Sequence, residues 1–330
     1  MQKKKKRVLV TGAGGFIGHY LVKYLSRKGY WVRGVDIKLP EYEKTYASQF
    51  ELLDLRHFEN CLIATRDIEE VYALAADMGG MGYISFNHAT IFHNNSLINI
   101  NTLEASRIND IKRYFFASSA CVYPEYKQLK TNSKPLKEKD AYPAQPQDAY
   151  GWEKLMTERL CNHYREDFGI ESRIARFHNI FGPLGTWNGG REKAPAAICR
   201  KIALAKLTNN PEVEIWGDGK QTRSFCYIDD CVEGIYKLMH SSYSKPVNIG
   251  QDRLISINEL AYMVADIAGT KIKLKHVDGP QGVRGRNSDN ALSRKVLKWQ
   301  PKISLENGLK NTYIWVENEV RKNYKINAKR

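Results

Sequence analysis

The sequence predicts an α/β protein, with a doubly wound parallel sheet joined to a smaller mixed α/β domain. Three observations support this fold class. Short β-rich runs alternate with helical patterns over the first 180 residues, a glycine-rich segment joins the first run to the first helix, and the pattern then becomes irregular. Strands that alternate with helices form right-handed βαβ units and hence a parallel sheet. A chain of 330 residues is long enough for two such domains.

The first part of the chain contains six runs that predict strands. They cover residues 7–11, 30–36, 50–54, 70–76, 112–118 and 171–178. Helical spacing occurs between some of these runs. It extends from the glycine-rich segment to about residue 28, and covers residues 94–109 and 149–168. We therefore assign residues 1–180 to one domain with a parallel sheet.

The second part of the chain predicts a smaller domain. Helices are expected over 191–207, 230–240, 256–269 and 304–322, and a strand over 213–216. Ser256 with Glu259 three residues later is a capping-box pattern, which predicts the start of the third helix. We assign residues 181–330 mainly to a substrate-binding domain. Segments near 220–245 are expected to return to the first domain.

The composition excludes several classes of protein. Hydrophobic residues at 42% and charged residues at 26% are typical of a soluble globular chain rather than a disordered or fibrous one. No run approaches the roughly 18 apolar residues that a membrane span needs. The basic run 3–7 is not followed by the features of a signal peptide. The six cysteines have no metal-ligand spacing and are expected as thiols, so we expect a cytoplasmic protein without a metal.

The formal charge of +15 is concentrated at the ends. Residues 1–7 and 321–330 each carry five positive charges, which leaves five for the rest of the chain. We expect two solvated ends. A nucleic-acid-binding protein built on a catalytically silent scaffold is the alternative from another class. No interleaved aromatic and basic RNA motif supports it, so we expect no nucleic-acid partner.

A glycine motif marks a candidate dinucleotide site. Gly12, Gly15 and Gly18 lie between the first strand and the first helix, where a tight turn lets backbone amides approach a pyrophosphate. Asp36 ends the second strand. A carboxylate there accepts hydrogen bonds from ribose hydroxyls and repels a 2′-phosphate, which favours NAD over NADP. The alternative is a structural glycine turn with a solvent-facing Asp36.

Tyr150 and Lys154 are four residues apart and project from one face of a helix. A neighbouring ammonium favours the phenolate, which can take a proton from an alcohol while hydride leaves the same carbon. The helix follows a strand that ends at Ser118-Ser119, where a hydroxyl can join the proton network. By spacing alone a solvated surface pair would be the better interpretation, and the position of the pair after this strand favours the catalytic one.

These motifs together resemble the extended short-chain dehydrogenases/reductases that act on sugar nucleotides. The segments that carry the resemblance are 11–18, 74–76, 118–123, 150–154 and 223–230. The resemblance implies a Rossmann domain that binds NAD through the glycine motif, including Phe16 and Ile17. It further implies that Tyr150 is the redox base, that Lys154 also binds the nicotinamide ribose, that Ser119 bonds the sugar hydroxyl and that Asp54 contacts the adenine.

Ala120-Cys121 stands where the 4,6-dehydratases of this superfamily have an Asp-Glu pair, which disfavours dehydration. On spacing alone Cys121 is best explained as a small buried residue. Longer segments resemble the family of GDP-mannose 3,5-epimerases: 75–82, 117–125, 146–151, 176–179, 189–195 and 282–290. Another NAD-dependent sugar-nucleotide epimerase, such as a UDP-sugar 4-epimerase, is the alternative within the class.

This second resemblance implies which residues act on the sugar. Cys121 would be the base and Lys193 the acid for proton exchange at C5 and C3, between oxidation and re-reduction at C4. It also implies a GDP-mannose substrate and, by analogy, a homodimer. Arg223 and Arg286 suit a diphosphate. The implied substrate contacts are Gly79, Ser119, Ala120, Cys121, Asn179, Glu192, Lys193, Ala194, Pro195, Lys201, Gln221, Arg223 and Arg286.

Overall fold

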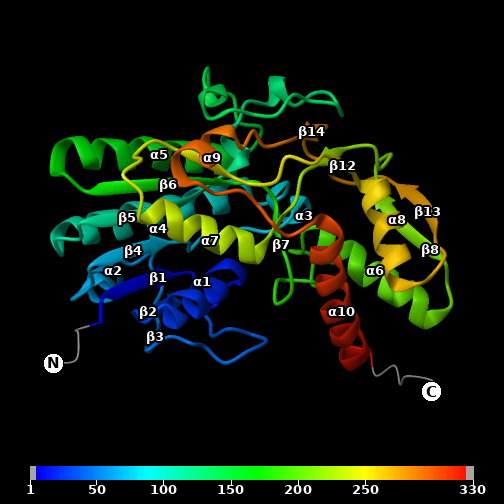
Figure 1. Cartoon of the computed structure of the whole chain (residues 1–330), viewed down its shortest axis with the longest axis horizontal. Helices are drawn as coiled ribbons and strands as arrows, with labels where there is room; N and C mark the ends of the chain where they lie inside the picture. Colours follow the sequence, from blue (N-terminus) through cyan, green and yellow to red (C-terminus); the bar gives the residue numbers. More distant parts are fainter. Residues whose placement is uncertain (1–4, 325–330) are drawn as a thin grey trace.

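A seven-stranded parallel sheet forms the centre of the molecule (Figure 1). The computed structural model describes residues 5–324. The strand order is β11-β6-β5-β4-β1-β2-β3, and every neighbouring pair is parallel. The strands are β1 (Arg7–Thr11), β2 (Trp31–Asp36), β3 (Gln49–Leu52), β4 (Glu70–Ala73), β5 (Arg113–Ser119), β6 (Glu171–Phe177) and β11 (Val247–Ile249). The predicted fold class is confirmed.

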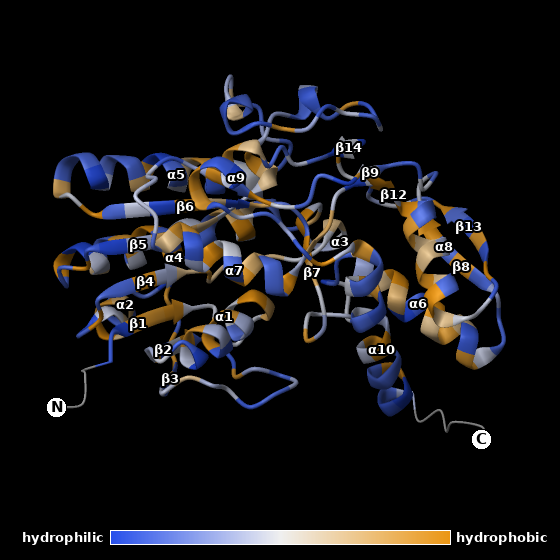
Figure 2. Ribbon diagram, in the orientation of Figure 1, coloured by the Kyte–Doolittle hydropathy of each residue, from blue (hydrophilic) through white to orange (hydrophobic). Residues whose placement is uncertain are grey.

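Helices cover both faces of this sheet, which makes it doubly wound. One face carries α1 (Phe16–Arg27) and α7 (Ile228–Met239), which pack against each other. The other carries α2 (Phe58–Thr65), α4 (His88–Ile108) and α5 (Ala149–Phe168). Figure 2 shows an apolar β1 and alternating apolar and polar stretches along the helices. The helix predicted over 94–109 begins earlier, at His88, and the short α2 was not predicted.

A smaller lobe stands beside the carboxyl ends of the main strands (right in Figure 1). Its helices α6 (Ala194–Thr208), α8 (Ile257–Ala268) and α10 (Leu305–Asn323) pack together. A parallel pair, β8 (Glu212–Trp216) and β13 (Lys273–Val277), completes it. The predicted capping box at the start of α8 is present: the Ser256 hydroxyl accepts from Glu259 N, and the Glu259 carboxylate accepts from Ser256 N.

Short segments connect the lobe to the sheet. The strands β7 (Ile180–Phe181) and β10 (Cys226–Tyr227) pair, and β9 (Thr222–Arg223) lies between β12 (Ile255–Ser256) and β14 (Gly285–Arg286). The short helices α3 (Met81–Ile84) and α9 (Ala291–Leu297) complete the described elements outside 3-10 turns. Two elements after residue 180 join the first domain: β11 is a strand of the main sheet, and α7 packs on one face of it. The domain bounds 1–180 and 181–330 stay a prediction.

Two basic residues near the N-terminal end, Lys6 and Arg7, are partly exposed and also contact the fold. Lys6 binds the buried carboxylate of Glu70, and the Arg7 guanidinium stacks on Trp31, 3.7 Å from the ring centroid. Residues 1–4 and 325–330 lie outside the described part, so the expectation of solvated basic ends is not tested there. Among the described helices, none has both the length and the apolar character needed to cross a membrane.

Candidate active site

The glycine-rich segment forms the turn between β1 and α1. Gly15 is the N-cap of α1 and no side chain caps this end, so the first amides of the helix stay available to an anion. The backbone of Gly18 packs against the turn at Gly12: a Cβ on Gly18 would lie 2.0 Å from the carbonyl oxygen of Gly12. The sequence therefore needs glycine at this position for the helix to pack on the turn. A pyrophosphate fits this arrangement of amides.

Asp36 ends β2 beside the same turn. Its carboxylate accepts hydrogen bonds from the backbone N–H of Gly14 at 3.0 Å and of Lys38 at 3.2 Å. Burial raises the pKa of Asp36, and these backbone donors lower it. A carboxylate has about four lone-pair positions, so acceptor capacity remains for the two hydroxyls of a ribose. The turn and Asp36 together fit a dinucleotide.

Asp54, the predicted adenine contact, follows β3. Its carboxylate accepts from the Arg56 guanidinium through Nε and Nη2, and this neighbour lowers the pKa of Asp54. The pair is partly exposed. An adenine amino group would therefore share the carboxylate with Arg56, and the contact stays a prediction.

Tyr150 and Lys154 lie in the first turns of α5, as the sequence predicted. Both are buried, and the Lys154 Nζ lies 5.4 Å from the Tyr150 ring centroid and 3.6 Å from Glu153 Oε1. Burial raises the pKa of Tyr150 well above its usual value, the nearby Glu153 raises it further, and Ser119 lowers it. The phenol is thus protonated unless a further positive charge approaches, as a cationic nicotinamide ring would.

Gly151 brings Cys121 to the start of α5. A Cβ at this position would lie 2.3 Å from the carbonyl oxygen of Cys121, so only glycine permits the approach. Cys121 is partly buried and packs against the cluster that contains Tyr150. The Ser119 hydroxyl accepts a hydrogen bond from Cys121 N at 3.2 Å. The structure therefore brings Ser119, Cys121 and Tyr150 together, as the proposed chemistry needs.

Arg286 also reaches this cluster. Its Nη1 donates to the Cys121 Sγ at 3.3 Å, and its Nε donates to the Gln128 Oε1 at 2.6 Å. Gln128 is fully buried and is fixed by two further bonds, from its Nε2 to the carbonyls of Tyr123 and Pro124. Sequence reasoning missed Gln128, because nothing in its spacing separates it from an ordinary loop residue.

Arg223 and Arg286 are cross-strand partners of β9 and β14. Neither has a carboxylate within 4.0 Å among the described residues, although Arg286 is buried. Burial lowers the pKa of Arg223 to about 9, and the positive charge of Arg286 lowers it as well. Two adjacent guanidinium groups without a counter-charge fit a diphosphate, whose oxygens bind such groups bidentately.

Two loops that carry the family resemblance contact each other next to this cluster. Gly80 N donates to the carbonyl of Arg191 at 3.0 Å, and the Arg191 guanidinium pairs with Asp77 at 3.1 Å. Lys193 follows in the second loop as the N-cap of α6. Burial lowers the pKa of Lys193, and the electrostatic influence of Cys121 acts in the opposite direction. The role of Lys193 toward a substrate stays a prediction.

The other predicted substrate contacts have protein partners in the structure. Asn179 Nδ2 donates to the carbonyl of Ser224 at 2.9 Å, and Lys201 Nζ donates to the carbonyl of Glu214 at 2.6 Å. Lys201 therefore ties α6 to β8, and its role toward a substrate stays a prediction. The small predicted residues lie at turns and helix starts, namely Gly79, Ala120, Ala194 and Pro195.

Glu192 and Gln221 differ in whether all their polar side-chain atoms have hydrogen-bond partners. The Glu192 carboxylate accepts from Gly190 N and from the Arg200 guanidinium, both at 2.7 Å. Gln221 is buried and its Nε2 donates to the carbonyl of Trp216 at 3.1 Å, but its Oε1 has no partner among the described residues. A buried acceptor without a donor is costly, and a ligand donor would relieve this cost.

The fold and the site define a dinucleotide-binding protein with a buried tyrosine–lysine pair beside a partly buried thiol. A family model described as the NAD dependent epimerase/dehydratase family matches residues 8–250, and the chain belongs to this family. It is 53% identical over 318 residues to the GDP-mannose 3,5-epimerase of Arabidopsis thaliana. The alignment covers 96% of this chain and 83% of that relative. The family resemblance seen in the sequence is confirmed, and so is the dependence on NAD.

Solved structures agree with this assignment. The UDP-glucose 4-epimerase with UDP-glucose from Thermotoga maritima superposes with a TM-score of 0.84 at 26% identity, covering 95% of this chain and 99% of that chain. The UDP-glucuronic acid 4-epimerase from Bacillus cereus, in complex with UDP-glucuronic acid and NAD, has a TM-score of 0.79 at 26% identity and the same coverage.

Proposed function

We propose that this protein is an isomerase that converts GDP-D-mannose to GDP-L-galactose, with GDP-L-gulose as the product of inversion at C5 alone. The observation that carries the proposal is the thiol of Cys121, which packs against the Tyr150 cluster and receives the Arg286 guanidinium. A 4-epimerase needs no such additional proton-transfer group. The 53% identity to a GDP-mannose 3,5-epimerase across most of the chain supports the substrate.

Oxidation at C4 begins with proton removal. Bound NAD supplies the hydride acceptor at this step and the hydride donor at the end. Tyr150 takes the proton of the C4 hydroxyl, and Lys154, buried beside it, stabilises the phenolate. Ser119 bonds the same hydroxyl. The C4 ketone then makes the hydrogens at C3 and C5 acidic, because each carbanion is delocalised as an enolate.

Inversion at C5 and C3 needs a base on one face of the sugar and an acid on the other. Cys121 is the base in this proposal, and the Arg286 guanidinium on its sulfur supports the role because a neighbouring cation stabilises a thiolate. Lys193 is the acid, and its lowered pKa supports easy proton release. Arg223 and Arg286 bind the diphosphate, so Arg286 contacts both the ligand and the base.

Deuterium incorporation tests the proposed function directly. The protein is incubated with NAD and GDP-mannose in deuterated water, and the sugar is analysed by NMR and mass spectrometry. Deuterium at C3 and C5, together with GDP-L-galactose, is expected. Inversion at C4 without exchange at C3 or C5 would assign a 4-epimerase instead. Steep salt-dependent RNA binding with no turnover would favour the nucleic-acid alternative.

We also infer a cytoplasmic homodimer. The helices α4 and α5 pack side by side and expose Phe92, Ile100 and Trp152, apolar area that a second copy would cover. All six cysteines are free thiols, which supports a reducing compartment. Light scattering should give twice the chain mass of 37.9 kDa, and fractionation of cells should find the protein outside organelles. A monomeric mass would contradict the dimer.

A further inference from the structure

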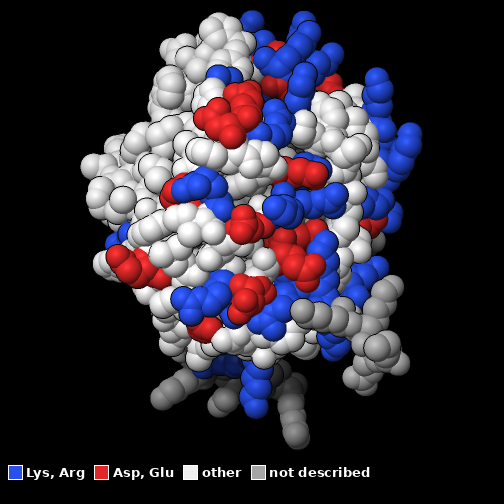
Figure 3. All heavy atoms as spheres, turned by 90° about the vertical axis from the view of Figure 1, so that its left-hand side faces the viewer, with Lys and Arg blue, Asp and Glu red and all other residues white. Residues whose placement is uncertain are grey.

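A pocket lies at the amino ends of the main strands, at the opposite end of the sheet from the candidate active site. It has a volume of about 340 Å³ and lies where β5 and β6 begin and where the chain leaves α7. Figure 3 views the molecule from this side, where basic and acidic side chains are intermixed. The pocket is lined by Arg113, Arg165, Glu171, Arg173, His240, Ser241, Ser242 and Ser244. Three guanidinium groups therefore face one carboxylate.

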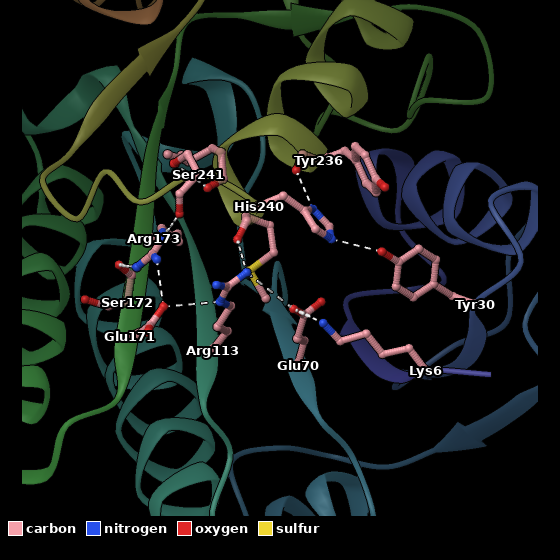
Figure 4. A network of polar contacts seen from close by, with 12 residues as sticks. Lys6, Tyr30, Glu70, Arg113, Glu171, Ser172, Arg173, Tyr236, His240 and Ser241 are labelled. Carbon is pink, nitrogen blue, oxygen red and sulfur yellow. Dashed lines mark hydrogen bonds and ion pairs between the residues drawn. The ribbon is translucent and has the colours of Figure 1, made fainter. Parts of the chain in front are cut away.

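Glu171 bridges two of the three arginines (Figure 4). Its Oε2 accepts from Arg113 Nε at 3.2 Å and from Arg173 Nη2 at 2.8 Å. The next carboxylate, Glu70, lies 4.0 Å from Arg113 but is already paired with Lys6. A single carboxylate shared between two guanidiniums leaves the pocket lining with an excess of two positive charges.

The positive charges of this lining act on the pKa of Arg173. Burial lowers the pKa of Arg173, Glu171 raises it, and the charges of Arg113 and Arg165 lower it again. Arg173 is almost completely buried, so water does not fully screen this repulsion. An anion in the pocket would remove it.

The chain after α7 fixes the orientation of two guanidiniums. The carbonyl of Ser241 accepts from Arg173 Nε at 2.9 Å, and the carbonyl of Ser244 accepts from Arg165 Nη1 at 3.0 Å. A guanidinium has five N–H donors. The bond to Ser244 is the only hydrogen bond that the Arg165 guanidinium makes with the described residues, so most of its donors stay available to a ligand.

We propose that this pocket binds the phosphate group of a small molecule. A phosphate monoester carries a charge of about −1.5 to −2 at neutral pH, which matches the excess charge of the lining. Its oxygens suit the paired N–H groups of arginine. The volume leaves room for a small organic group on the phosphate. The inference is independent of the proposed function, because no residue of the candidate active site takes part.

Calorimetry with inorganic phosphate as the probe tests this proposal. The protein is saturated with NAD and GDP beforehand, so that its other phosphate-binding positions are filled. We expect saturable binding at millimolar phosphate. Arg165→Gln should weaken this binding at least tenfold, because it removes a charged donor with little structural role. Arg159→Gln is the matched control: Arg159 is exposed on the same helix and does not line the pocket.

A third variant separates ligand binding from a loss of folding. Glu171→Gln removes the carboxylate that competes for the arginines, so phosphate affinity should rise severalfold. A merely damaged pocket would give the opposite change. Absence of saturable binding to the unmodified protein overturns the proposal, as does an equal loss in Arg159→Gln and Arg165→Gln. Thermal unfolding of each variant identifies any change in stability.

Discussion

Arg286 places its guanidinium on the sulfur of Cys121, with 3.3 Å between Nη1 and Sγ, although the two residues are 165 positions apart in the chain. The contact joins β14 of the connecting segments to the turn after β5. A cation that contacts a thiol favours its use as a base. The same cation also borders Arg223, so in the proposed mechanism Arg286 contacts both the base and the diphosphate.

The first prediction concerns Cys121. Cys121→Ala should abolish deuterium exchange at C3 and C5 of GDP-mannose, because the base is removed, while NAD binds as before. NMR of the recovered sugar and a fluorescence titration with NAD measure the two effects. Cys61→Ala, which removes a thiol buried in the core, is the control and should retain exchange. Normal epimerisation by Cys121→Ala would make Cys121 a structural residue.

The second prediction concerns the residue that holds Arg286. Gln128→Leu should lower kcat about tenfold or more with a smaller change in KM. The Arg286 Nε loses its acceptor in this variant, so the guanidinium moves away from the Cys121 sulfur. Loss of a buried hydrogen-bond partner costs about 1–3 kcal/mol of stability, which chemical unfolding measures. Gln128→Glu keeps an acceptor for Nε and should retain more activity than Gln128→Leu. Equal loss in both variants would argue for a purely structural role.

The third prediction concerns Lys193. Lys193→Gln should stop the formation of epimers, because no acid delivers a proton to the opposite face of the sugar. Cys121 still removes and returns protons, so deuterium should enter the recovered GDP-mannose. Because burial lowers the pKa of Lys193, the activity of the unmodified protein should fall with rising pH below the ordinary lysine value of 10.5. Unchanged yields of epimer from Lys193→Gln would contradict the assignment.

The fourth prediction concerns Arg223, with the nearby Arg284 as its control. Arg223→Met should raise KM for GDP-mannose about tenfold or more, since a partly buried guanidinium on the diphosphate is lost. Arg284→Met is the control. Arg284 pairs with the exposed Asp218 and makes no contact with the Cys121 cluster among the described residues. Steady-state kinetics would refute the diphosphate role if both variants showed the same KM as the unmodified protein.

The fifth prediction concerns stability at acid pH. His178 is fully buried, and burial lowers its pKa to about 3, with Arg286 and Arg176 adding to the effect. The unfolded chain binds a proton at this residue with a pKa near 6.5, so it holds more protons than the folded chain between the two values. The free energy of unfolding should therefore fall as pH drops from 6.5 toward 3, by at most about 1.4 kcal/mol per pH unit from this group.

Urea unfolding at several pH values measures this contribution. His178→Gln should have a shallower pH dependence over the same interval, because its side chain does not titrate. The hydrogen bond to Asn248 can be retained by the glutamine amide. An identical pH dependence in both proteins would assign the acid sensitivity to other groups.

Features that depend on residues close together in the chain could be predicted from the sequence. The alternation of strands and helices predicted the parallel sheet, the glycine motif predicted the turn into α1, and four-residue spacing placed Tyr150 and Lys154 on one face of α5. These are local signals, because hydrogen bonding within a helix and side-chain alternation along a strand repeat over a few residues. The short elements α2 and β11 were missed, since so few residues carry little periodic signal.

Contacts between residues far apart in the chain became known only from the folded structure. The pairing of β9 with β14 sets Arg223 beside Arg286, and the burial of Gln128 holds Arg286 on Cys121. Packing also gives the partly exposed Lys6 and Arg7 contacts with Glu70 and Trp31. Such contacts follow from how the elements pack. Local sequence patterns do not predict them, because the free energy that stabilises them comes from burial shared by many residues.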